Sequence, residues 1–289
     1  MKGMILSGGL GTRLYPLTSA TGKQLLPIYD KPMIYYPLAN LMSAGMREIL
    51  VISSREHMYL YEKMLGDGSR FGIKLTYKIQ EKPIGIADSF IIAEDFIANS
   101  PICLILGDNI FVGDDFAGKI SNAASSLNSG AIVFGRKVQD PERYGVVSFD
   151  QSGNVKQIVE KPKEYISNYA ITGLYCCDAT VVSKAKSLKP SARGELEITD
   201  IQNLYLQEGK LKVEILDEYT AWLDAGTFDS LMEASLYVQL SEKLLGKKIA
   251  CLEEIAFRQG WINKEQIVSM FKNPNQNSYV KYISELIRK

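Results

Sequence analysis

Glycines and two cations near the N-terminus are the first residues whose types and spacing indicate chemistry. Residues 8–13 read GGLGTR and directly follow an apolar segment, 2–7. Glycines allow backbone N–H groups to approach phosphate oxygens, and the Arg13 guanidinium can contact one phosphate through two N–H groups. Lys23 adds a positive charge ten residues further along. This spacing favours a polyphosphate site, although a glycine-rich turn that binds nothing is also consistent with the loop alone.

The loop matches neither of two familiar nucleotide-binding motifs. A P-loop needs Gly-Lys-Ser/Thr after four intervening residues, and the loop lacks that run. The dinucleotide fingerprint needs glycine at position 14, where this chain has Leu14. A nicotinamide-dependent oxidoreductase therefore remains an alternative that the loop itself does not favour.

Carboxylates follow two apolar segments further along the chain. Asp108 follows the strand-like segment 104–106, and Asp224 follows 221–223. Mg²⁺ takes oxygen ligands and keeps several waters, so one or two carboxylates suffice to hold it. Each aspartate taken alone is equally consistent with a turn or a helix cap. A histidine-dependent catalytic mechanism or metal site is not favoured, because the single histidine, His57, lies in a segment predicted to be helical.

Composition excludes several classes of protein. The chain has 289 residues, 33 Lys+Arg against 33 Asp+Glu, and a pI near 6.6, which argues against a dedicated nucleic-acid binder. No apolar run approaches the roughly 20 residues of a membrane span, and the N-terminal apolar stretch is too short for a signal peptide. The four cysteines show no CxxC spacing, so we expect reduced core thiols in a cytoplasmic protein.

The elements that must position these residues follow a β-α-β rhythm in the first half of the chain. Predicted strands are 2–7, 48–53, 74–79, 102–106 and 131–138, and predicted helices are 34–44, 56–65, 86–97 and 116–127. Their short connections predict an α/β fold in which helices cover both faces of a Rossmann-like, mostly parallel sheet. Such a sheet binds its ligand at the carboxyl ends of its strands, where the glycine loop begins.

The rhythm changes after about residue 139. Residues 145–149 and 155–159 flank the turn sequence DQSGN, which indicates a β-hairpin. The other predicted elements are strands at 169–177 and 211–216, helices at 179–187 and 199–208, and a mainly helical segment from 227 onward. We therefore predict one domain over 1–289, made of an α/β part (about 1–139), a β-rich insertion (about 140–226) and a helical C-terminal extension (227–289).

Seven motifs of this chain, in order, resemble those of the sugar nucleotidyltransferases. They are residues 8–13, 23–38, 107–111, 140–146, 160–162, 190–200 and 221–224. The likeness extends over nearly the whole chain and implies the nucleotide-diphospho-sugar transferase fold, with a sugar-binding β-rich insertion. Within the family it is greatest to members that join dTTP and glucose 1-phosphate into dTDP-glucose. That reaction is the first step of dTDP-sugar synthesis, such as that of dTDP-rhamnose, for polysaccharides.

The resemblance implies that a sugar phosphate oxygen attacks the α-phosphorus of a nucleoside triphosphate in line, with Mg²⁺ present and pyrophosphate leaving. It implies catalytic roles for Arg13, Lys23 and Lys161, and metal ligation by Asp108 and Asp224. The implied nucleotide contacts are Leu6, Gly8, Gly9, Gly11, Thr12, Arg13, Lys23, Gln80, Pro83, Gly85 and Asp108. The implied sugar-phosphate contacts are Tyr144, Gly145, Glu160, Lys161, Ile171, Tyr175, Arg193, Thr199 and Trp222.

Base recognition is expected to involve Gln80. Its amide offers one acceptor and two donors, which suit the imide edge that thymine and uracil share. Discrimination between dTTP and UTP must then come from the methyl group and the ribose hydroxyl. A hydrophobic contact is worth only ~1–3 kcal/mol, so use of UTP stays open, as does another hexose phosphate.

The resemblance also implies a homotetramer with feedback regulation at a subunit interface. The candidate regulatory residues are Gly113, Glu254, Ile255 and Arg258. Relatives often carry Arg at position 218, where this chain has Glu218, and an acid facing a phosphate would weaken such a site. A non-catalytic nucleotide-sensing protein is a further alternative, although all the implied catalytic and metal-binding residues are present.

Overall fold

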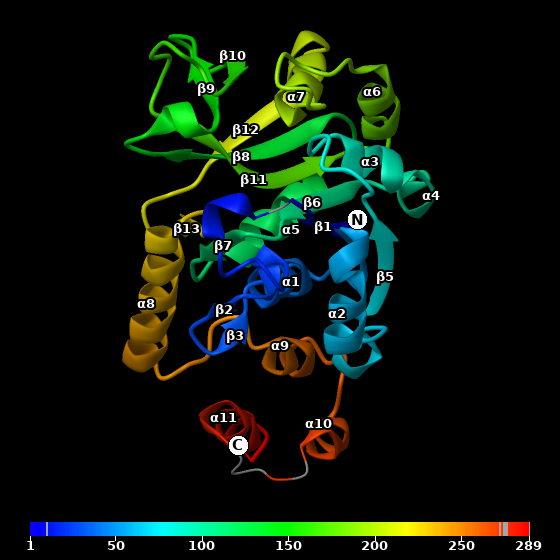
Figure 1. Ribbon diagram of the computed structural model, residues 1–289, viewed down its shortest axis with the longest axis vertical. Helices are drawn as coiled ribbons and strands as arrows, with labels where there is room; N and C mark the ends of the chain where they lie inside the picture. The colour runs from blue at the N-terminus through cyan, green and yellow to red at the C-terminus, as the bar shows by residue number, and fades with distance from the viewer. Residues whose placement is uncertain (10, 272, 274–276, 289) are drawn as a thin grey trace.

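The computed structural model describes residues 1–9, 11–271, 273 and 277–288, and within them nine strands form one sheet (Figure 1). Four of these strands are parallel neighbours in the order β6-β1-β4-β5. They are β1 (Lys2–Ser7), β4 (Glu48–Ser53), β5 (Lys74–Ile79) and β6 (Ile102–Leu106). The predicted α/β sheet is confirmed here, and the parallel strands bring the segments that follow β1, β5 and β6 to one edge of the sheet.

Five further strands extend the sheet beyond β6. They are β8 (Ala131–Lys137), β9 (Gly145–Phe149), β10 (Val155–Glu160), β11 (Tyr169–Cys177) and β12 (Leu211–Ile215). β11 runs antiparallel to β6, β8 and β9, the predicted β9–β10 hairpin is antiparallel, and β12 runs parallel to β8. The β-rich insertion therefore shares one sheet with the α/β part, which places its residues beside those of the glycine loop.

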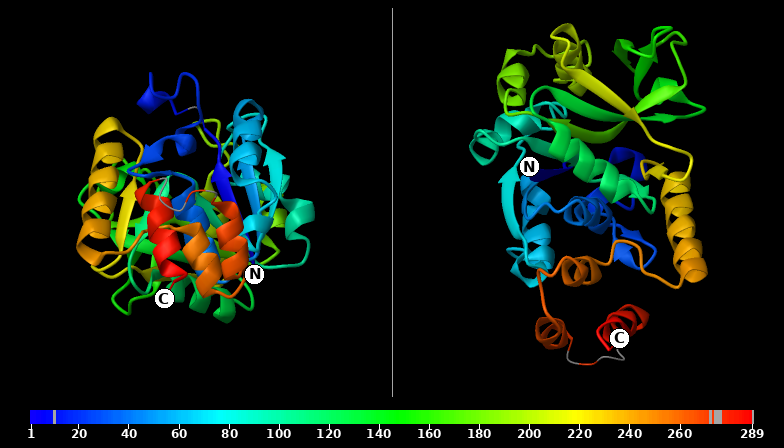
Figure 2. Two further views of the ribbon diagram at one scale, coloured as in Figure 1. Left: turned by 90° about the horizontal axis from the view of Figure 1, so that it is seen from below. Right: turned by 180° about the vertical axis from the view of Figure 1, so that it is seen from behind.

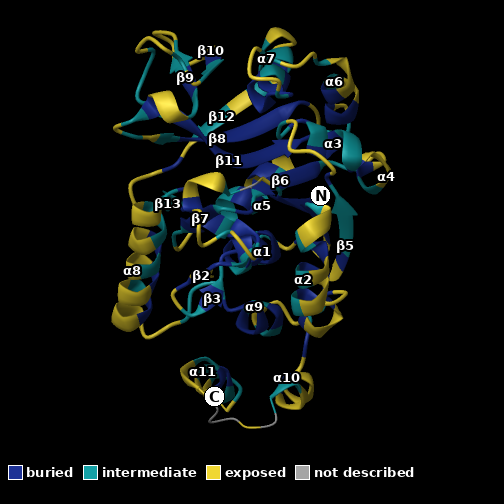
Figure 3. Ribbon diagram, viewed as in Figure 1, coloured by how far each residue is buried: buried dark blue, intermediate teal, exposed yellow. Residues whose placement is uncertain are grey.

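Helices cover both faces of the sheet, because successive strand residues point to opposite sides and both sides are apolar. Ile5 packs in a core with α1 (Tyr35–Ser43), α2 (Arg55–Leu65) and α5 (Phe116–Ser126). Met4 and Leu6 pack in a second core with α3 (Asp88–Ile92), α4 (Glu94–Ile97), α6 (Val181–Ser187) and α7 (Ile198–Gln207). Figure 3 shows the central strands β6, β8 and β11 buried, while the outer faces of the helices are exposed. All four cysteines are buried free thiols, as predicted.

The predicted C-terminal extension is helical. It comprises α8 (Phe228–Leu245), α9 (Leu252–Arg258), α10 (Lys264–Met270) and α11 (Ser278–Leu286). Figures 1 and 2 show α8 along one side of the molecule, with α9, α10 and α11 grouped below the α/β part. α8 begins with a capping box between Thr227 and Ser230. Within the described ranges, none of the helices combines the length and apolar character needed to cross a membrane.

The structure differs from the predicted elements in three places. The expected helix at 86–97 is two short helices, α3 and α4, which meet at Ala93. A small hairpin of β2 (Pro27–Ile28) and β3 (Lys31–Pro32) was not predicted, nor was the antiparallel pair β7 (Asn109–Val112) and β13 (Ala221–Asp224). Strands of two to four residues are too short to show an alternating pattern. The β7–β13 pair matters for function, because it brings Asn109 opposite Asp224.

Candidate active site

Two adjoining cavities lie where the glycine loop, the β7–β13 pair and the β-rich insertion meet. The larger encloses about 630 Å³ and the smaller about 230 Å³. Gly8, Gly9, Gly11, Thr12 and Lys23 line the smaller one. Arg13 and Asp108 line both. The expected nucleotide-phosphate residues and sugar-phosphate residues therefore line two neighbouring cavities that share Arg13 and Asp108.

The glycine loop needs its glycines for backbone reasons. Gly9 and Gly11 have φ angles of 94° and 60°, in the region that side chains disfavour. A Cβ at Gly11 would also lie 2.8 Å from Thr18 Cγ2. The loop leads into a single 3₁₀ turn, Thr12–Leu14, which carries Arg13 into both cavities.

Lys23 and Asp108 form a salt bridge at the floor of the smaller cavity. The Lys23 Nζ lies 2.6 Å from Asp108 Oδ2, and Lys23 is only 7% exposed. Asn109 Nδ2 donates to the other oxygen of Asp108 at 2.9 Å. Burial alone would raise the pKa of Asp108, but the Lys23 charge and these hydrogen bonds outweigh it and hold the pKa below its usual value. Asp108 is thus an ionised carboxylate at the junction of the two cavities.

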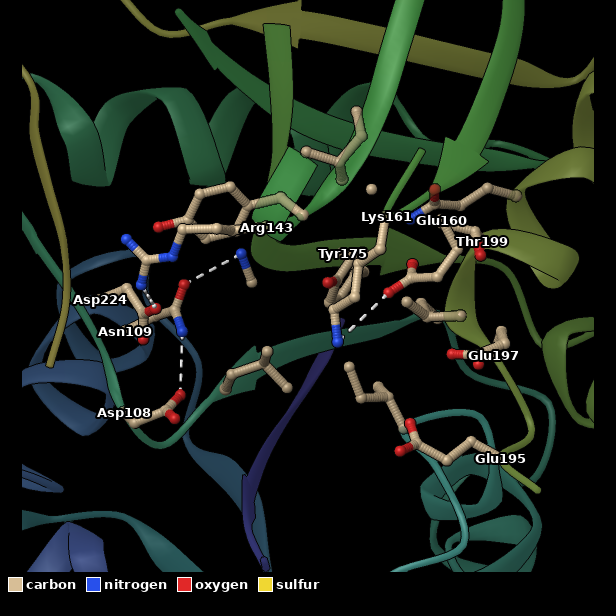
Figure 4. Close-up of a pocket in the computed structure, with 18 of the residues that line it drawn as sticks. Asp108, Asn109, Arg143, Glu160, Lys161, Tyr175, Glu195, Glu197, Thr199 and Asp224 are labelled. Carbon is tan, nitrogen blue, oxygen red and sulfur yellow. Dashed lines mark hydrogen bonds and ion pairs between the residues drawn. The ribbon is translucent and has the colours of Figure 1, made fainter. Parts of the chain in front are cut away.

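Asp224 supplies a second carboxylate beside the first. Burial and the negative charge of Asp108 raise the pKa of Asp224, while Lys23, Arg13 and Arg143 oppose that shift. Arg143 Nη2 lies 3.4 Å from Asp224 Oδ2. A Cβ at Gly226 would lie 3.0 Å from Arg13 Nη2 and 3.1 Å from Asp224 Oδ1, so glycine there lets both groups approach. Figure 4 shows Asp108, Asn109, Asp224 and Arg143 gathered at one end of the larger cavity.

Glu160, Lys161 and Thr199 lie at the opposite end of the larger cavity (Figure 4), and Arg193, which also lines the cavity, contacts Glu160. Arg193 Nη1 lies 3.3 Å and Lys161 Nζ 3.8 Å from Glu160 Oε1. Lys161 has a φ of 41°, a strained value for a non-glycine residue that turns the chain sharply after β10. Burial and the neighbouring Glu197 raise the pKa of Glu160. Two cations and a carboxylate here suit a ligand that carries both a phosphate and hydroxyl groups.

Polar atoms without partners also line this end. Among the described residues, neither the nitrogen nor the oxygen of the buried Gln202 side-chain amide has a hydrogen-bond partner. Unpaired buried polar atoms are costly, and a bound polyhydroxyl ligand would satisfy them. Gly145 is required by the same crowding, because a Cβ there would lie 2.8 Å from Thr199 Cγ2 and 3.5 Å from Glu160 Oε2.

Aromatic and apolar side chains form the wall between the two ends. Tyr144, Ile171, Tyr175 and Trp222 all line the larger cavity. The Tyr144 and Trp222 rings lie 5.0 Å apart. Trp222 Nε1 donates to Asn109 Oδ1 at 2.7 Å, and this oxygen also accepts from the Gly173 N–H at 3.1 Å. Asn109 thus ties β7 to β13 and β11.

The sequence did not single out several residues that line this cavity. They are Ile86, Leu106, Asn109, Arg143, Gly173, Glu195, Glu197, Ile198 and Gln202. Asn109, Arg143, Glu195, Glu197 and Ile198 lie inside motifs that carry the family resemblance, so position within a motif was the available signal. Gly173 and Gln202 gave none, because nothing in their local sequence marks them.

On the base side, Gln80 is buried next to the glycine loop. A Cβ at Gly8 would lie 2.7 Å from Gln80 Oε1. Gln80 Nε2 donates to Asp88 Oδ2 at 2.9 Å and to the Gly85 carbonyl at 3.3 Å. The expectation of one acceptor and two donors for a base needs correction, because both donors are engaged within the protein and only the acceptor Oε1 remains. Leu6, Gln80, Pro83 and Gly85 line neither of the two cavities.

The candidate regulatory residues lie elsewhere. Gly113 and Ile255 line a separate cavity of about 690 Å³ between α1, α8 and the segment after β7. Glu254 and Arg258 do not line it, and they pair with each other at 2.8 Å. Tyr282 donates to Glu254 at 2.7 Å, so α11 is bound to this pair.

Comparisons with known proteins find relatives of the whole chain. A family profile described as "Nucleotidyl transferase" matches residues 2–240. A glucose-1-phosphate thymidylyltransferase of Neisseria gonorrhoeae is 53% identical, and one of Mycobacterium tuberculosis is 44% identical, each over 289 residues that cover 100% of both chains. A Bacillus anthracis crystal structure superposes with a TM-score of 0.76 at 45% identity, covering 82% of this chain and 94% of that one. A UDP-glucose pyrophosphorylase complexed with UDP-glucose has a TM-score of 0.73 at 24% identity, over 83% and 98% of the two chains, and supports the fold alone.

Proposed function

This chain belongs to the nucleotidyl transferase family, and we propose that it transfers a thymidylyl group from dTTP to α-D-glucose 1-phosphate, giving dTDP-glucose and pyrophosphate. Full-length relatives of that activity support the choice of substrates. The structural observation that carries the proposal is the junction of the two cavities at Arg13 and Asp108. One cavity presents a glycine loop and a lysine, and the other presents cations and unpaired polar atoms.

The reaction exchanges one phosphoanhydride bond for another and needs no general base. An ionised oxygen of the sugar phosphate attacks the α-phosphorus of dTTP, and the bond from that phosphorus to the bridging oxygen of pyrophosphate breaks. The main obstacle is the repulsion between two anionic groups, so catalysis depends on positioning and charge neutralisation. This requirement explains why a chain with one histidine is adequate for the chemistry.

The cations divide between the two substrates. Arg13 and Lys23 face the triphosphate, with the glycine-loop N–H groups cradling its oxygens, and Lys161 and Arg193 hold the sugar phosphate. Glu160 and Thr199 accept or donate hydrogen bonds at the sugar hydroxyls, over the open backbone at Gly145. This assignment is supported by the lining of the two cavities, which separates the first pair of cations from the second except at Arg13.

A Mg²⁺ ion fits between Asp108 and Asp224. The negative charge of Asp108 helps to raise the pKa of Asp224, and a divalent cation held by both carboxylates would offset that repulsion. No cluster of three or more potential metal ligands occurs in the described part of the chain. Two carboxylates together with substrate oxygens match the way Mg²⁺ is commonly held at phosphate sites. When bound, the ion would neutralise charge on the phosphate groups that react.

Regulation and assembly remain proposals. We expect a homotetramer working in the cytoplasm. We also expect weak feedback inhibition, because Glu218 is an exposed acid and Arg258 is already paired with Glu254. UTP is a plausible second nucleotide, since nothing about Gln80 distinguishes thymine from uracil.

The decisive experiment is pyrophosphate release from a panel of nucleoside triphosphates crossed with sugar 1-phosphates, with and without a chelator. We expect the maximum with dTTP and glucose 1-phosphate, and its loss on removal of Mg²⁺. A maximum with another pair would retain the reaction and replace the substrates. Nucleotide binding without release from any pair would overturn the proposed activity in favour of a nucleotide sensor.

A further inference from the structure

The side-chain amide of Gln80 is held in one orientation. Gln80 follows β5 at the carboxyl edge of the parallel strands and is only 5% exposed. Its backbone N–H donates to the Ser53 carbonyl at 2.8 Å, which anchors the residue to the end of β4. Both hydrogens of its Nε2 have acceptors, Asp88 Oδ2 at 2.9 Å and the Gly85 carbonyl at 3.3 Å. An amide nitrogen has two hydrogens, so Gln80 has no donor left for a ligand.

The free end of this amide is its oxygen, and it faces the nucleotide loop. Gln80 Oε1 lies 2.7 Å from the position that a Cβ at Gly8 would take. Among the described residues, no donor reaches this oxygen. Turning the amide over would set Oε1 against the Asp88 carboxylate and the Gly85 carbonyl, so that three acceptors would face one another. That arrangement loses two hydrogen bonds and leaves buried polar atoms unsatisfied, which disfavours it strongly.

Asp88 is the stronger of the two constraints on this orientation. Its contact with Gln80 is shorter than that of Gly85, and a hydrogen bond to an ionised acceptor is stronger than one to a carbonyl. Within the described residues, no Lys or Arg forms a salt bridge with Asp88, so its carboxylate is not drawn away from Gln80. A carboxylate can only accept, whereas an amide or hydroxyl at this position could also donate.

We propose that Asp88 is a positioning residue that makes Gln80 an obligate acceptor, so that the base site selects a pyrimidine with a ring N3–H. This inference rests on the proposed function and on the assignment of Gln80 to the base. Thymine and uracil carry that hydrogen. Cytosine carries a lone pair at N3, which would face the lone pairs of Oε1. Asp88 therefore sets the choice between imide and amidine bases without touching the nucleotide, and it leaves recognition of the thymine methyl to other groups.

The test compares three deoxynucleotides, dTTP, dUTP and dCTP, each with glucose 1-phosphate, in the wild type and in Asp88→Asn. Asparagine keeps the shape of the side chain, but it can present either a donor or an acceptor to Gln80. We expect the ratio of kcat/KM for dTTP over dCTP to fall by about tenfold or more. The ratio for dTTP over dUTP should stay unchanged, because both bases have the N3–H.

Two further variants keep the result interpretable. Asp88→Ala removes the acceptor altogether and should lower the same ratio. Asp95→Asn is the matched control, since Asp95 lies on the neighbouring helix α4 and pairs with Lys78 instead of Gln80. Thermal denaturation of each variant verifies that it is folded.

The outcomes separate this inference from the proposed function. If the Asp88 variants lower the rates with all three nucleotides by the same factor, Asp88 has only a structural role and the inference is overturned. The inference is equally overturned if the dTTP/dCTP ratio is unchanged in both variants. If the wild type itself shows no turnover with dTTP, the proposed function fails first, and that failure is seen before any variant is compared.

Discussion

At the scale of single residues, Asp108 is the most constrained group in the site, because it serves both cavities and neutralises Lys23. We expect Asp108→Asn to lower turnover by about 100- to 1,000-fold or more, a loss typical of removing a charged group that acts on the transition state. Steady-state pyrophosphate release at saturating Mg²⁺ measures it, with Asp95→Asn as the control. Near-native turnover of Asp108→Asn would contradict the metal assignment.

The carboxylate of Glu197 next to Glu160 predicts how kcat/KM for glucose 1-phosphate depends on pH. Burial and then Glu197 raise the pKa of Glu160, so in the wild type this carboxyl becomes protonated at a higher pH than an ordinary glutamate. Protonation removes an acceptor for the sugar hydroxyls, and kcat/KM for glucose 1-phosphate therefore falls as the pH drops through that raised pKa. Glu197→Gln removes the neighbouring charge, which lowers the pKa of Glu160 and moves this acid limb to lower pH.

The measurement is the pH profile of kcat/KM for glucose 1-phosphate in both proteins. The substrate phosphate titrates identically in the two profiles, so its contribution cancels in the comparison. The KM for dTTP serves as a control, because Glu197 lines only the larger cavity. An acid limb that stays in place, or moves to higher pH, would show that Glu160 does not govern sugar binding.

At the scale of elements, the loop before α3 is fastened to the segment before α7. Leu196 N–H donates to the Ile84 carbonyl at 2.7 Å, and Ala87 N–H donates to the Leu196 carbonyl at 3.2 Å. Gly85 has a φ of 124°, and a Cβ there would lie 2.3 Å from the Leu196 carbonyl oxygen. This contact joins the base side of the site to the sugar side, so its loss should affect both.

We expect Gly85→Ala to lower the free energy of unfolding by roughly 1–3 kcal/mol beyond a simple backbone penalty and to raise the KM for dTTP. Gly153→Ala is the matched control. Gly153 has a φ of 82°, but a Cβ there would meet nothing within 4 Å. Backbone strain alone should therefore lower the free energy of unfolding of Gly153→Ala by about 1–2 kcal/mol, and its activity should be unchanged. Urea denaturation and dTTP saturation curves measure both effects. Equal behaviour of the two variants would show that the Leu196 contact does not hold the site together.

Some strands of the fold could be predicted from the sequence and others could not. Strands β1, β4 and β6 were predictable because each contains a continuous apolar run, and β5 was predictable because polar and apolar residues alternate along Lys74–Ile79. β7 and β13 were not predictable, because a segment of four residues such as Asn109–Val112 is too short to show an alternation of polar and apolar residues. These two strands are recognised only by their pairing with each other in the folded chain. The same pairing explains why Asp108 and Asp224 could be chosen from family motifs while Asn109, which fixes them in place, was missed.

At the scale of the whole molecule, α8 leaves an apolar ridge uncovered. Phe228, Met232, Leu236, Leu240 and Leu244 recur every four residues and are all exposed, Leu244 at 84%. Such i, i+4 ridges are the surfaces through which helices pack on one another. The ridge carries its charges unevenly, with Asp229 and Glu233 near the start of the helix and Lys243 near its end. Antiparallel pairing with a second copy about a two-fold axis at Leu236 therefore sets opposite charges beside one another, as a self-complementary interface requires.

We accordingly expect α8 to form a subunit contact of the proposed homotetramer and Leu236→Asp to break it, since two carboxylates would meet at the axis in an apolar interface. Sedimentation velocity should show a smaller species for this variant than for the wild type, with the far-ultraviolet circular dichroism of the folded chain retained. Val268→Asp is the matched control, because Val268 is also an exposed apolar residue but lies on α10, away from the ridge. If Leu236→Asp sediments like the wild type, the ridge is not an interface. A monomeric wild type would exclude the assembly itself. Activity measured on the dissociated variant then shows whether catalysis requires assembly. The two cavities are built from one chain, so turnover should survive dissociation.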